Sequence, residues 1–243
     1  MAAMKKELRG QVAFVTGGSK GIGFGIAQAL VARGVHVVIT GRGAADLESA
    51  TQRLQGAPGQ VDAVVVDVRD YAAVAAAIAQ TVGRLGGLDI VVNNAGIGTF
   101  VTVADMTPEQ WAGVIDTNVT GVFNVCHAAL PALKKRGGGY IVNISSLAGK
   151  NAFVGAGAYC ASKAALNQFA EVLNQEVRHD NIKVTTIAPG SVATAFAGGD
   201  EAKGSEWKIA SADIGDMVVD LLELDTRSLP SYIELRPSKP PKK

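Results

Sequence analysis

Several features are scarce in this 243-residue sequence, and each scarcity argues against a class of protein. The two cysteines, Cys126 and Cys160, lack the spacing of metal ligands or of a redox pair, so we expect both thiols to be buried. The net charge of only +1 gives no electrostatic attraction to nucleic acid or to a membrane surface. No run reaches the ~18 apolar residues of a membrane-spanning helix, and residues 1–10 lack the apolar segment of a signal peptide. We therefore expect a soluble, cytoplasmic protein.

Aromatic residues are also scarce, at 5% of the chain, although 48% of the residues are hydrophobic. A sizeable core must therefore be built mainly from valine, alanine, isoleucine and leucine. Twenty-nine glycines gather at the ends of apolar runs, where they predict tight turns and close backbone contacts. His36, His127 and His179 are scattered, and no group of histidine, cysteine and acidic residues is spaced like a metal site. We expect no metal and no catalytic histidine.

Apolar, β-branched runs alternate with alanine-rich amphipathic segments along the whole chain. The runs predict strands at residues 12–16, 35–40, 63–66, 90–92, 140–144, 183–187 and 232–235. The segments between them predict helices at residues 23–32, 45–54, 71–84, 108–135, 158–179 and 212–224. Thr107-Pro108, with Gln110 following, is a helix-start signal. This β-α-β series predicts one α/β domain over residues 1–243, with a parallel sheet and a ligand crevice at the carboxyl ends of its strands.

Two segments depart from the alternating pattern. Residues 197–211 are the least patterned, and within the loop at about residues 195–211 we expect residues 198–204 to be mobile. The basic residues 237–243 predict a solvated tail, with a docking peptide as the alternative.

A glycine-rich loop follows the first expected strand directly and opens the first expected helix. It reads Thr16-Gly17-Gly18-Ser19-Lys20-Gly21-Ile22-Gly23. Gly17 permits a tight turn, Gly21 lets the backbone approach a diphosphate, and Gly23 lets the helix pack closely on the sheet. The helix N-terminus then presents free N–H groups to phosphate. An ordinary glycine-rich turn is the alternative, but the place of the loop at the first strand favours nucleotide binding.

Tyr159 and Lys163 lie four residues apart in an expected helix, so their side chains share one face of it. A lysine ammonium beside a phenol stabilises the tyrosinate, so we expect the pKa of Tyr159 to be lowered toward neutral pH. Such a phenol can give a proton to a carbonyl oxygen or take one from an alcohol. Ser146 lies thirteen residues upstream, and Ser145 beside it is the competing candidate. Tyrosine–lysine pairs also arise by chance on helices, so this one gains its weight from the serine and the glycine loop.

The order of the motifs resembles the short-chain dehydrogenase/reductase family from about Gly10 to Phe196. The resemblance lies in the glycine loop, Asn93-Asn94-Ala95-Gly96, Ser146, Tyr159 with Lys163, and Pro189-Gly190. It implies a single-domain, doubly wound Rossmann-type parallel sheet of about seven strands with helices on both faces. It also implies an NADP-preferring carbonyl or 3-oxoacyl reductase that acts on a small-molecule CH–OH or carbonyl substrate, assembled into a homodimer or homotetramer.

For catalysis, the resemblance implies hydride transfer between a nicotinamide and the substrate carbon. Tyr159 would exchange the proton, and Ser146 would hydrogen-bond the substrate oxygen. The family places this serine thirteen residues before the tyrosine, which selects Ser146 over Ser145. Lys163 would lower the pKa of Tyr159 and bind the nicotinamide ribose. Asn118 would hold a water that connects Lys163 to solvent. The alternative is a core asparagine at a bend, since asparagine is unfavourable inside a helix.

The residues after the second expected strand favour NADP(H) over NAD(H). An NAD site would place a carboxylate near Gly41, but Gly41 has no side chain and Arg42 follows it. Arg42 can form paired hydrogen bonds with a 2′-phosphate, and Lys20 adds a second positive charge, unless both are ordinary surface residues. Asp67 and Val68 would contact the adenine, although Asp67 also fits a strand-end turn. The resemblance implies further cofactor contacts at Ser19, Ile22, Asn94, Ala95, Gly96, Pro189, Gly190, Val192 and Thr194.

Four aromatic residues lie in segments that contact substrate in the family: Phe100, Phe153, Phe196 and Trp207. Packing in the core or against another subunit is the alternative for each. The ending, residues 228–237, lacks the paired glycines typical of 3-oxoacyl-[acyl-carrier-protein] reductases and resembles the 3-hydroxy acid and serine dehydrogenase branch. Both activities therefore stay open. A non-catalytic NADP-binding sensor is the hypothesis from another class, and the presence of Ser146, Tyr159 and Lys163 counts against it.

Overall fold

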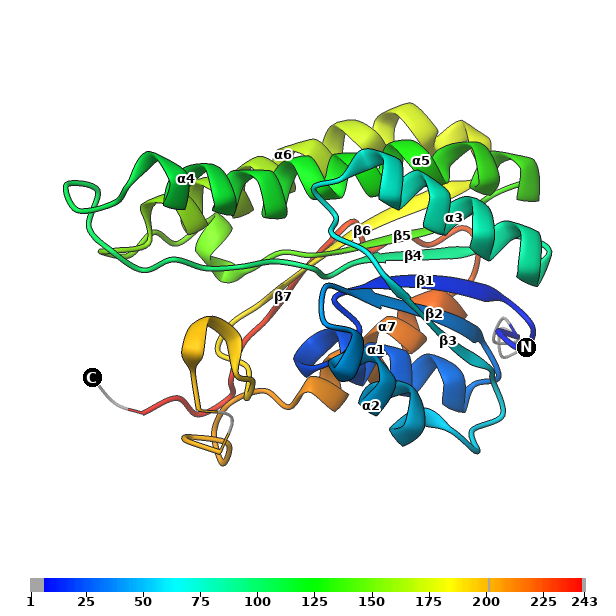
Figure 1. The fold of residues 1–243 in the computed structure, drawn as a ribbon, viewed down its shortest axis with the longest axis horizontal. Helices are drawn as coiled ribbons and strands as arrows, with labels where there is room; N and C mark the ends of the chain where they lie inside the picture. Colours follow the sequence, from blue (N-terminus) through cyan, green and yellow to red (C-terminus); the bar gives the residue numbers. More distant parts are fainter. Residues whose placement is uncertain (1–6, 201, 242–243) are drawn as a thin grey trace.

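The computed structural model describes residues 7–200 and 202–241, which contain a sheet of seven parallel strands (Figure 1). The strands are β1 (Val12–Thr16), β2 (His36–Gly41), β3 (Val61–Val65), β4 (Ile90–Asn93), β5 (Gly139–Ile144), β6 (Ile182–Pro189) and β7 (Tyr232–Leu235). Their order across the sheet is β3-β2-β1-β4-β5-β6-β7. The chain winds outward from β1 in one direction, crosses back to β4 and continues in the other. This is the doubly wound arrangement predicted from the sequence.

Helices cover both faces of the sheet (Figure 1). One face carries α1 (Gly21–Ala32), α2 (Ala44–Leu54) and α7 (Ser211–Glu223). The other carries α3 (Tyr71–Leu85), α4 (Pro108–Ile115), α5 (Gly121–Arg136) and α6 (Gly157–Val177). Short turns lie between them: the π-helical η1 (Asp116–Thr120) and the 3-10 turns η2 (Leu147–Gly149), η3 (Arg178–Asp180) and η4 (Phe196–Gly198). The sheet is therefore enclosed between two helical layers.

β1 shows why the central strands are apolar at successive positions. All five of its residues are buried, and their side chains alternate between the two faces. Ala13 and Val15 pack into the core beneath α1, α2 and α7, whereas Val12 and Phe14 pack into the core beneath α3, α5 and α6. A strand that faces two cores needs apolar residues at every position.

The predicted strands and helical segments are all present, with ends that shift by a few residues. The capping box predicted at Thr107 is confirmed, since its hydroxyl accepts a hydrogen bond from the backbone N–H of Gln110. The first helix begins at Gly21 rather than at Gly23, inside the glycine loop. The single helix predicted at 108–135 is wrong in one respect, because η1 inserts a π-helical turn between α4 and α5.

Narrower predictions have mixed outcomes. Cys126 is buried as predicted, and burial raises the pKa of its thiol to about 12. Cys160, on α6, is only partly buried, so the prediction of a buried thiol is wrong for this residue. Residue 201 of the expected loop and residues 242–243 of the basic tail lie outside the described residues.

Two glycines allow α1 and α7 to cross at close range. A Cβ on Gly215 would lie 2.5 Å from the carbonyl oxygen of Gly25, and one on Gly25 would lie 2.4 Å from that of Ser211. A Cβ does not approach a non-bonded heavy atom this closely in real proteins, so a side chain at either position would force the helices apart. Because residues from α1 and α7 share one buried core, this spacing determines how that core packs.

Gly215→Ala should lower the free energy of unfolding by about 1–3 kcal/mol, since the added methyl group overpacks the crossing. The matched control is Gly83→Ala on α3, where an added Cβ has no heavy atom within 4 Å. That substitution should instead stabilise the protein by up to about 1 kcal/mol, because alanine favours a helix. Urea unfolding measures both. Equal urea midpoints for the two variants would show that the crossing of α1 and α7 accommodates the added methyl group without loss of stability.

Candidate active site

The glycine loop lies between β1 and α1 as predicted. Gly17 and Gly21 have φ angles of +63° and +55°, a left-handed conformation that glycine adopts without strain. A Cβ on Gly23 would lie 2.2 Å from the carbonyl oxygen of Gly17. Gly23 therefore allows a close contact with the glycine loop, whereas the sequence predicted a close contact with the sheet. Ile22 is partly buried against the core. Lys20 begins α1 without a side-chain cap, so the first N–H groups of α1 suit the diphosphate of a dinucleotide.

The loop after β4 is tied directly to the glycine loop. The Thr16 hydroxyl accepts hydrogen bonds from the backbone N–H groups of Asn94 and Ala95, both at 3.0 Å. The Asn94 side-chain amide donates to the carbonyl oxygens of Thr16 and Gly17, also at 3.0 Å. Asn94 and Ala95, predicted as cofactor contacts, therefore also hold the loop in shape. Thr16 is not among the predicted site residues, although a threonine just before such a loop is a usable sequence signal.

Charged side chains surround the loop after β2, where the adenosine end of a cofactor is expected. Lys20 forms an ion pair with Asp46 at 3.2 Å, and both side chains are exposed. Arg42 is exposed, and within the described chain it forms no hydrogen bond or ion pair. A Cβ on Gly41 would lie 3.7 Å from the Ser19 hydroxyl oxygen, which is an ordinary contact distance. A carboxylate side chain would fit there sterically, so its absence is a chemical feature of this sequence.

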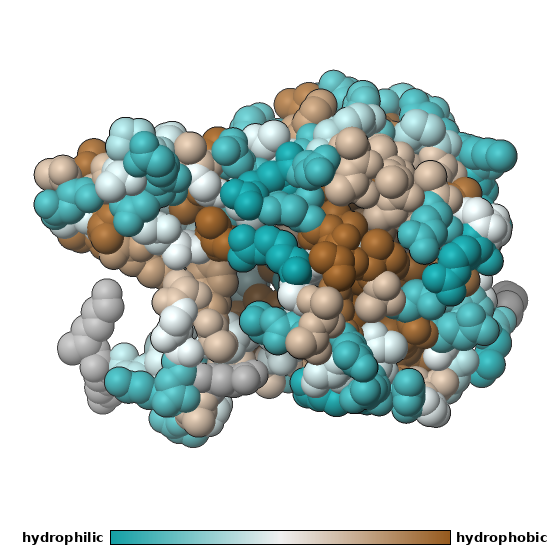
Figure 2. Space-filling view, viewed as in Figure 1, coloured by the Kyte–Doolittle hydropathy of each residue, from teal (hydrophilic) through white to brown (hydrophobic). Residues whose placement is uncertain are grey.

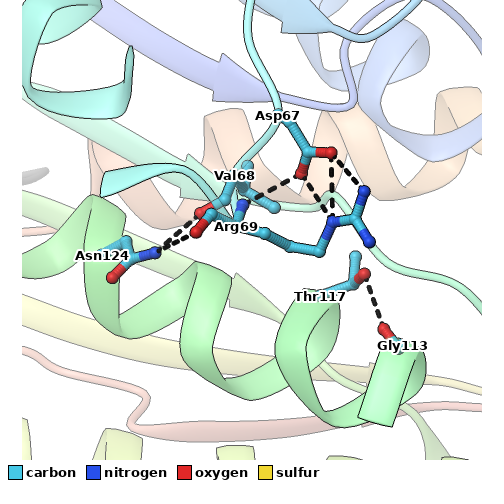
Figure 3. Close-up of polar contacts among 6 residues, drawn as sticks. All are labelled: Asp67, Val68, Arg69, Gly113, Thr117 and Asn124. Carbon is cyan, nitrogen blue, oxygen red and sulfur yellow. Dashed lines mark hydrogen bonds and ion pairs between the residues drawn. The ribbon is translucent and has the colours of Figure 1, made fainter. Parts of the chain in front are cut away.

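Asp67 and Val68 follow β3, and Figure 3 shows that Asp67 is held by Arg69. Hydrogen bonding by Arg69 lowers the pKa of the Asp67 carboxyl, and the charge of Arg42 adds a smaller effect in the same direction. The side-chain amide of Asn124 on α5 donates to the carbonyl oxygens of Val68 and Arg69. Arg69 and Asn124 were not predicted as site residues. A cation two residues after a strand-end aspartate is the available sequence signal for Arg69.

Ser146, Tyr159 and Lys163 come together as predicted. Tyr159 and Lys163 lie on α6, and Ser146 lies where β5 turns into η2. The Ser146 hydroxyl lies near enough to the Tyr159 phenol to lower its pKa by hydrogen bonding. The Ser145 hydroxyl instead donates to Asn167 Oδ1 at 2.6 Å and is buried. The geometry therefore favours Ser146 over Ser145 as the partner of Tyr159.

The predicted lowering of the Tyr159 pKa is wrong for this structure. Burial raises the pKa of Tyr159 and outweighs the hydrogen bond from Ser146, which lowers it. Burial also lowers the pKa of Lys163 to about 8. Lys163 Nζ donates to the carbonyl oxygen of Ile144 at 2.9 Å and lies 5.8 Å from the centre of the Tyr159 ring. At this distance the lysine does not offset the burial of the phenol.

Asn118 lies in η1 and holds the loop after β4. Its amide donates to the carbonyl oxygen of Ile97 and to the Ser162 hydroxyl, while its Oδ1 accepts from the N–H of Ile97. A Cβ on Gly96 would lie 3.2 Å from Asn118 Oδ1 and 3.7 Å from Lys163 Nζ. Asn118 is therefore adjacent to Lys163 across Gly96. A bound water at Asn118 stays a prediction.

Three of the four predicted aromatic residues gather around Tyr159. The ring centres of Phe100 and Phe196 each lie 5.6 Å from that of Tyr159, and Phe153 lies 5.9 Å from Phe100. A Cβ on Gly98 would lie 3.0 Å from both Phe100 and Phe196, so the absence of a side chain lets the two rings approach. Phe100, Phe153 and Phe196 are partly exposed and offer an apolar surface to a ligand at the phenol.

Trp207 is placed differently from the other three. Its ring packs at Gly204 and lies 5.9 Å from Lys208 Nζ, within the segment that follows η4. Figure 2 shows the molecule hollowed between the arm that contains α4 and the loop that follows β6. The aromatic surface near Tyr159 is built from three separate segments, which are the loop after β4, the loop between η2 and α6, and η4.

The loop after β6 reaches the glycine loop. A Cβ on Gly21 would lie 3.2 Å from Thr194 Cγ2. Val192 pairs with Ile209 in an isolated bridge, and Pro189 ends β6. A Cβ on Gly190 would lie 3.0 Å from Pro237 and 3.1 Å from Leu147. Thr194 is thereby held beside the helix N-terminus that suits a diphosphate.

Other ligand classes find little support. Among residues 7–200 and 202–241, no three histidine, cysteine or acidic side chains form a group that could hold a metal ion. None of the described helices is both long and apolar enough to cross a membrane.

Comparison with known proteins identifies the family. The family model described as short chain dehydrogenase matches residues 11–204. The 3-oxoacyl-[acyl-carrier-protein] reductase FabG of Chlamydia muridarum is 40% identical over 207 residues, which are 84% of this chain and 83% of the relative. An alcohol dehydrogenase from the archaeon Thermococcus sibiricus, solved in complex with 5-hydroxy-NADP, is 28% identical with a TM-score of 0.89, over 96% of this chain and 99% of that one. A metagenomic short-chain oxidoreductase in complex with NADP is 33% identical with a TM-score of 0.85, over 97% of this chain and all of the other.

The matched region contains the glycine loop and the Ser146, Tyr159 and Lys163 group. The seven-stranded doubly wound sheet agrees with the structural neighbours over nearly the whole chain. The chain therefore belongs to the short-chain dehydrogenase family and is an oxidoreductase that acts on CH–OH groups.

Proposed function

We propose that the protein reduces a 3-oxoacyl-type carbonyl substrate with NADPH, and that Tyr159 supplies the proton. The observation that carries the proposal is the Tyr159–Ser146 hydroxyl pair, set among the rings of Phe100 and Phe196. The relative from Chlamydia muridarum bears a 3-oxoacyl reductase name, and two structural neighbours were solved with NADP or a hydroxylated NADP. These names support the substrate class and the cofactor.

The mechanism needs two hydroxyl groups at one carbonyl oxygen. When bound, the nicotinamide supplies the hydride to the carbonyl carbon. Negative charge then develops on the oxygen, and the Ser146 hydroxyl stabilises it by donating a hydrogen bond. Tyr159 transfers its phenolic proton to the same oxygen and completes the alcohol. Lys163 lies one helical turn away and would bind the nicotinamide ribose.

The raised pKa of Tyr159 keeps the phenol in the protonated form that carbonyl reduction needs. Because burial holds that pKa above its ordinary value, the phenol stays protonated at neutral pH and can act as a proton donor. Alcohol oxidation needs the tyrosinate, which burial disfavours.

The surroundings of Tyr159 favour an uncharged, partly apolar substrate over a 3-hydroxy acid. A carboxylate beside the reacting carbonyl would need a cationic partner. Lys150 is engaged with Glu234 at 3.2 Å and lies over the Tyr232 ring at 3.7 Å. The semialdehyde-reducing activity is thus the less favoured alternative. Assembly into a homodimer or homotetramer and a cytoplasmic location stay predictions.

A carbonyl panel with NADPH and NADH tests this function. A 3-oxoacyl thioester should be reduced faster than malonic semialdehyde, and Tyr159→Phe should lower kcat by about 10²–10⁴-fold, the usual contribution of a positioned acid. Tyr71→Phe, on the exposed side of α3, is the matched control and should keep full activity. Preference for the semialdehyde would support the hydroxy-acid alternative. NADPH binding without turnover of any substrate would support the sensor hypothesis.

The pH dependence of kcat/KM for NADPH should show a fall above about pH 8. Lys163 has a pKa lowered to about 8, so it is charged below that pH and neutral above it. Loss of the charge weakens cofactor binding, whereas Tyr159, with its raised pKa, stays protonated through this range. In Lys163→Arg the guanidinium stays charged to above about pH 12, so the fall should disappear even if the rate is lower. If kcat/KM still falls near pH 8 in Lys163→Arg, the titrating group is not Lys163.

Arg42→Ala should raise the Kd for NADPH about tenfold or more and leave the Kd for NADH nearly unchanged, since only NADPH has a 2′-phosphate. Titration of the fluorescence of the reduced nicotinamide measures both constants. Arg53→Ala is the control, because Arg53 lies at the other end of α2 and packs over the Phe24 ring. An unchanged NADPH to NADH ratio in Arg42→Ala would remove Arg42 from the cofactor site.

A further inference from the structure

Five charged side chains lie near the expected adenosine end of the cofactor, and their pairing is uneven. Lys20 pairs with Asp46 at 3.2 Å, and Arg69 pairs with Asp67 at 2.6 Å. Arg42 has no such partner within the described chain, although it is close enough to Asp67 to affect that carboxyl. Two carboxylates are thus matched by two cations, and Arg42 is the cation that remains.

Arg69 takes up most of the acceptor capacity of the Asp67 carboxylate. A carboxylate offers about four lone-pair positions. Arg69 engages most of them with three hydrogens: its backbone N–H donates to Oδ1 at 3.0 Å, its Nε–H is shared between Oδ1 at 3.0 Å and Oδ2 at 3.1 Å, and Nη2 donates to Oδ2 at 2.6 Å. The two residues are separated by one position, so little of the chain must be ordered to form this fork. Arg69 therefore both satisfies Asp67 and neutralises its charge.

The backbone of Arg69 is held independently of any ligand (Figure 3). Asn124 on α5 donates to the carbonyl oxygens of Val68 at 2.9 Å and Arg69 at 3.3 Å. A Cβ on Gly121 would lie 2.6 Å from Val68 Cγ2, so the turn after β3 packs directly on the start of α5. The fork between Arg69 and Asp67 is thus preorganised by buried contacts that belong to the fold.

We propose that Arg69 is a positioning residue for NADP(H) recognition: by occupying Asp67 it leaves the Arg42 guanidinium free for the 2′-phosphate of the cofactor. The inference rests on the proposed preference for NADP(H). Without Arg69, the Asp67 carboxylate would draw Arg42 into an ion pair and would also repel the phosphate. Both effects weaken the binding of NADPH and leave NADH, which has no 2′-phosphate, nearly unaffected.

Arg69→Ala should therefore raise the Kd for NADPH about tenfold, the usual scale for a lost charge-assisted hydrogen bond, and change the Kd for NADH by less than about twofold. The double variant Asp67→Asn with Arg69→Ala should restore the NADPH to NADH ratio of dissociation constants to within about twofold of that of the unsubstituted protein. The restoration follows because no carboxylate remains to capture Arg42. Asp67→Asn alone should leave the NADPH to NADH ratio of dissociation constants nearly unchanged, because any adenine contact of residue 67 is common to both dinucleotides. Fluorescence titrations of all variants with both dinucleotides provide the measurement.

A second Asp-x-Arg fork supplies the matched control. Asp225 accepts hydrogen bonds from the backbone N–H, Nε and Nη2 of Arg227 between α7 and β7, at the edge of the sheet where the strands begin. Arg227→Ala removes the same kind of fork and should leave both dissociation constants unchanged. Any general effect of losing a surface arginine would appear in this variant too.

The possible outcomes separate this inference from the proposed function. If Arg42→Ala weakens NADPH binding and Arg69→Ala does not, the positioning role of Arg69 is wrong and the cofactor assignment stands. If neither variant changes the NADPH to NADH ratio, the cofactor assignment itself is wrong. Equal weakening of NADPH and NADH in Arg69→Ala, or no restoration in the double variant, would mean that Arg69 acts on the nucleotide in another way and would overturn the inference.

Discussion

A close backbone contact connects the nucleotide end of this site to its catalytic end. The Cβ position of Gly23 lies 2.2 Å from the carbonyl oxygen of Gly17 and 2.4 Å from the side-chain nitrogen of Asn94. The start of α1 can therefore meet the loops after β1 and β4 only because residue 23 has no side chain. Two residues beyond Asn94, Gly96 lies against Asn118 and Lys163. The loop after β4 thus joins the phosphate-binding elements to the proton-transfer group.

Exclusion of water governs the chemistry at the other end of that loop. Phe100 and Phe196 pack around Tyr159, and Lys163 is buried beneath it. Burial shifts both groups toward their neutral forms. It keeps the phenol protonated, so that it can donate a proton, and it lowers the pKa at which the lysine loses its charge. In the same surroundings, any charge that develops on a substrate oxygen interacts strongly with nearby donors. One apolar environment therefore accounts both for the raised pKa of Tyr159 and for the expected strength of the Ser146 hydrogen bond.

The parts of the site that are local in sequence were predictable, and the parts that depend on packing were not. The glycine loop, the four-residue spacing of Tyr159 and Lys163, and the capping box at Thr107 each involve residues within one turn or loop. The π-helical turn at η1 had only a weak local signal, the asparagine at position 118, because the turn is held by contacts of Asn118 with Ile97 and Ser162, which are distant in sequence. The pKa of Tyr159 was predicted in the wrong direction for the same reason. Spacing places Lys163 on the correct face, but the carbonyl of Ile144 on β5 decides where its ammonium points.

By itself, the sequence determined that strands and helices alternate, that the first loop can receive a phosphate, and that a serine, a tyrosine and a lysine belong to one chemical group. These conclusions follow from periodicity and from conformations that only glycine adopts easily. The tertiary structure decided which aromatic residues surround the phenol and which arginine holds Asp67. Such questions depend on contacts between residues far apart in the chain, or on competition among several equivalent partners. Only the packed molecule brings those partners within hydrogen-bonding distance or separates them.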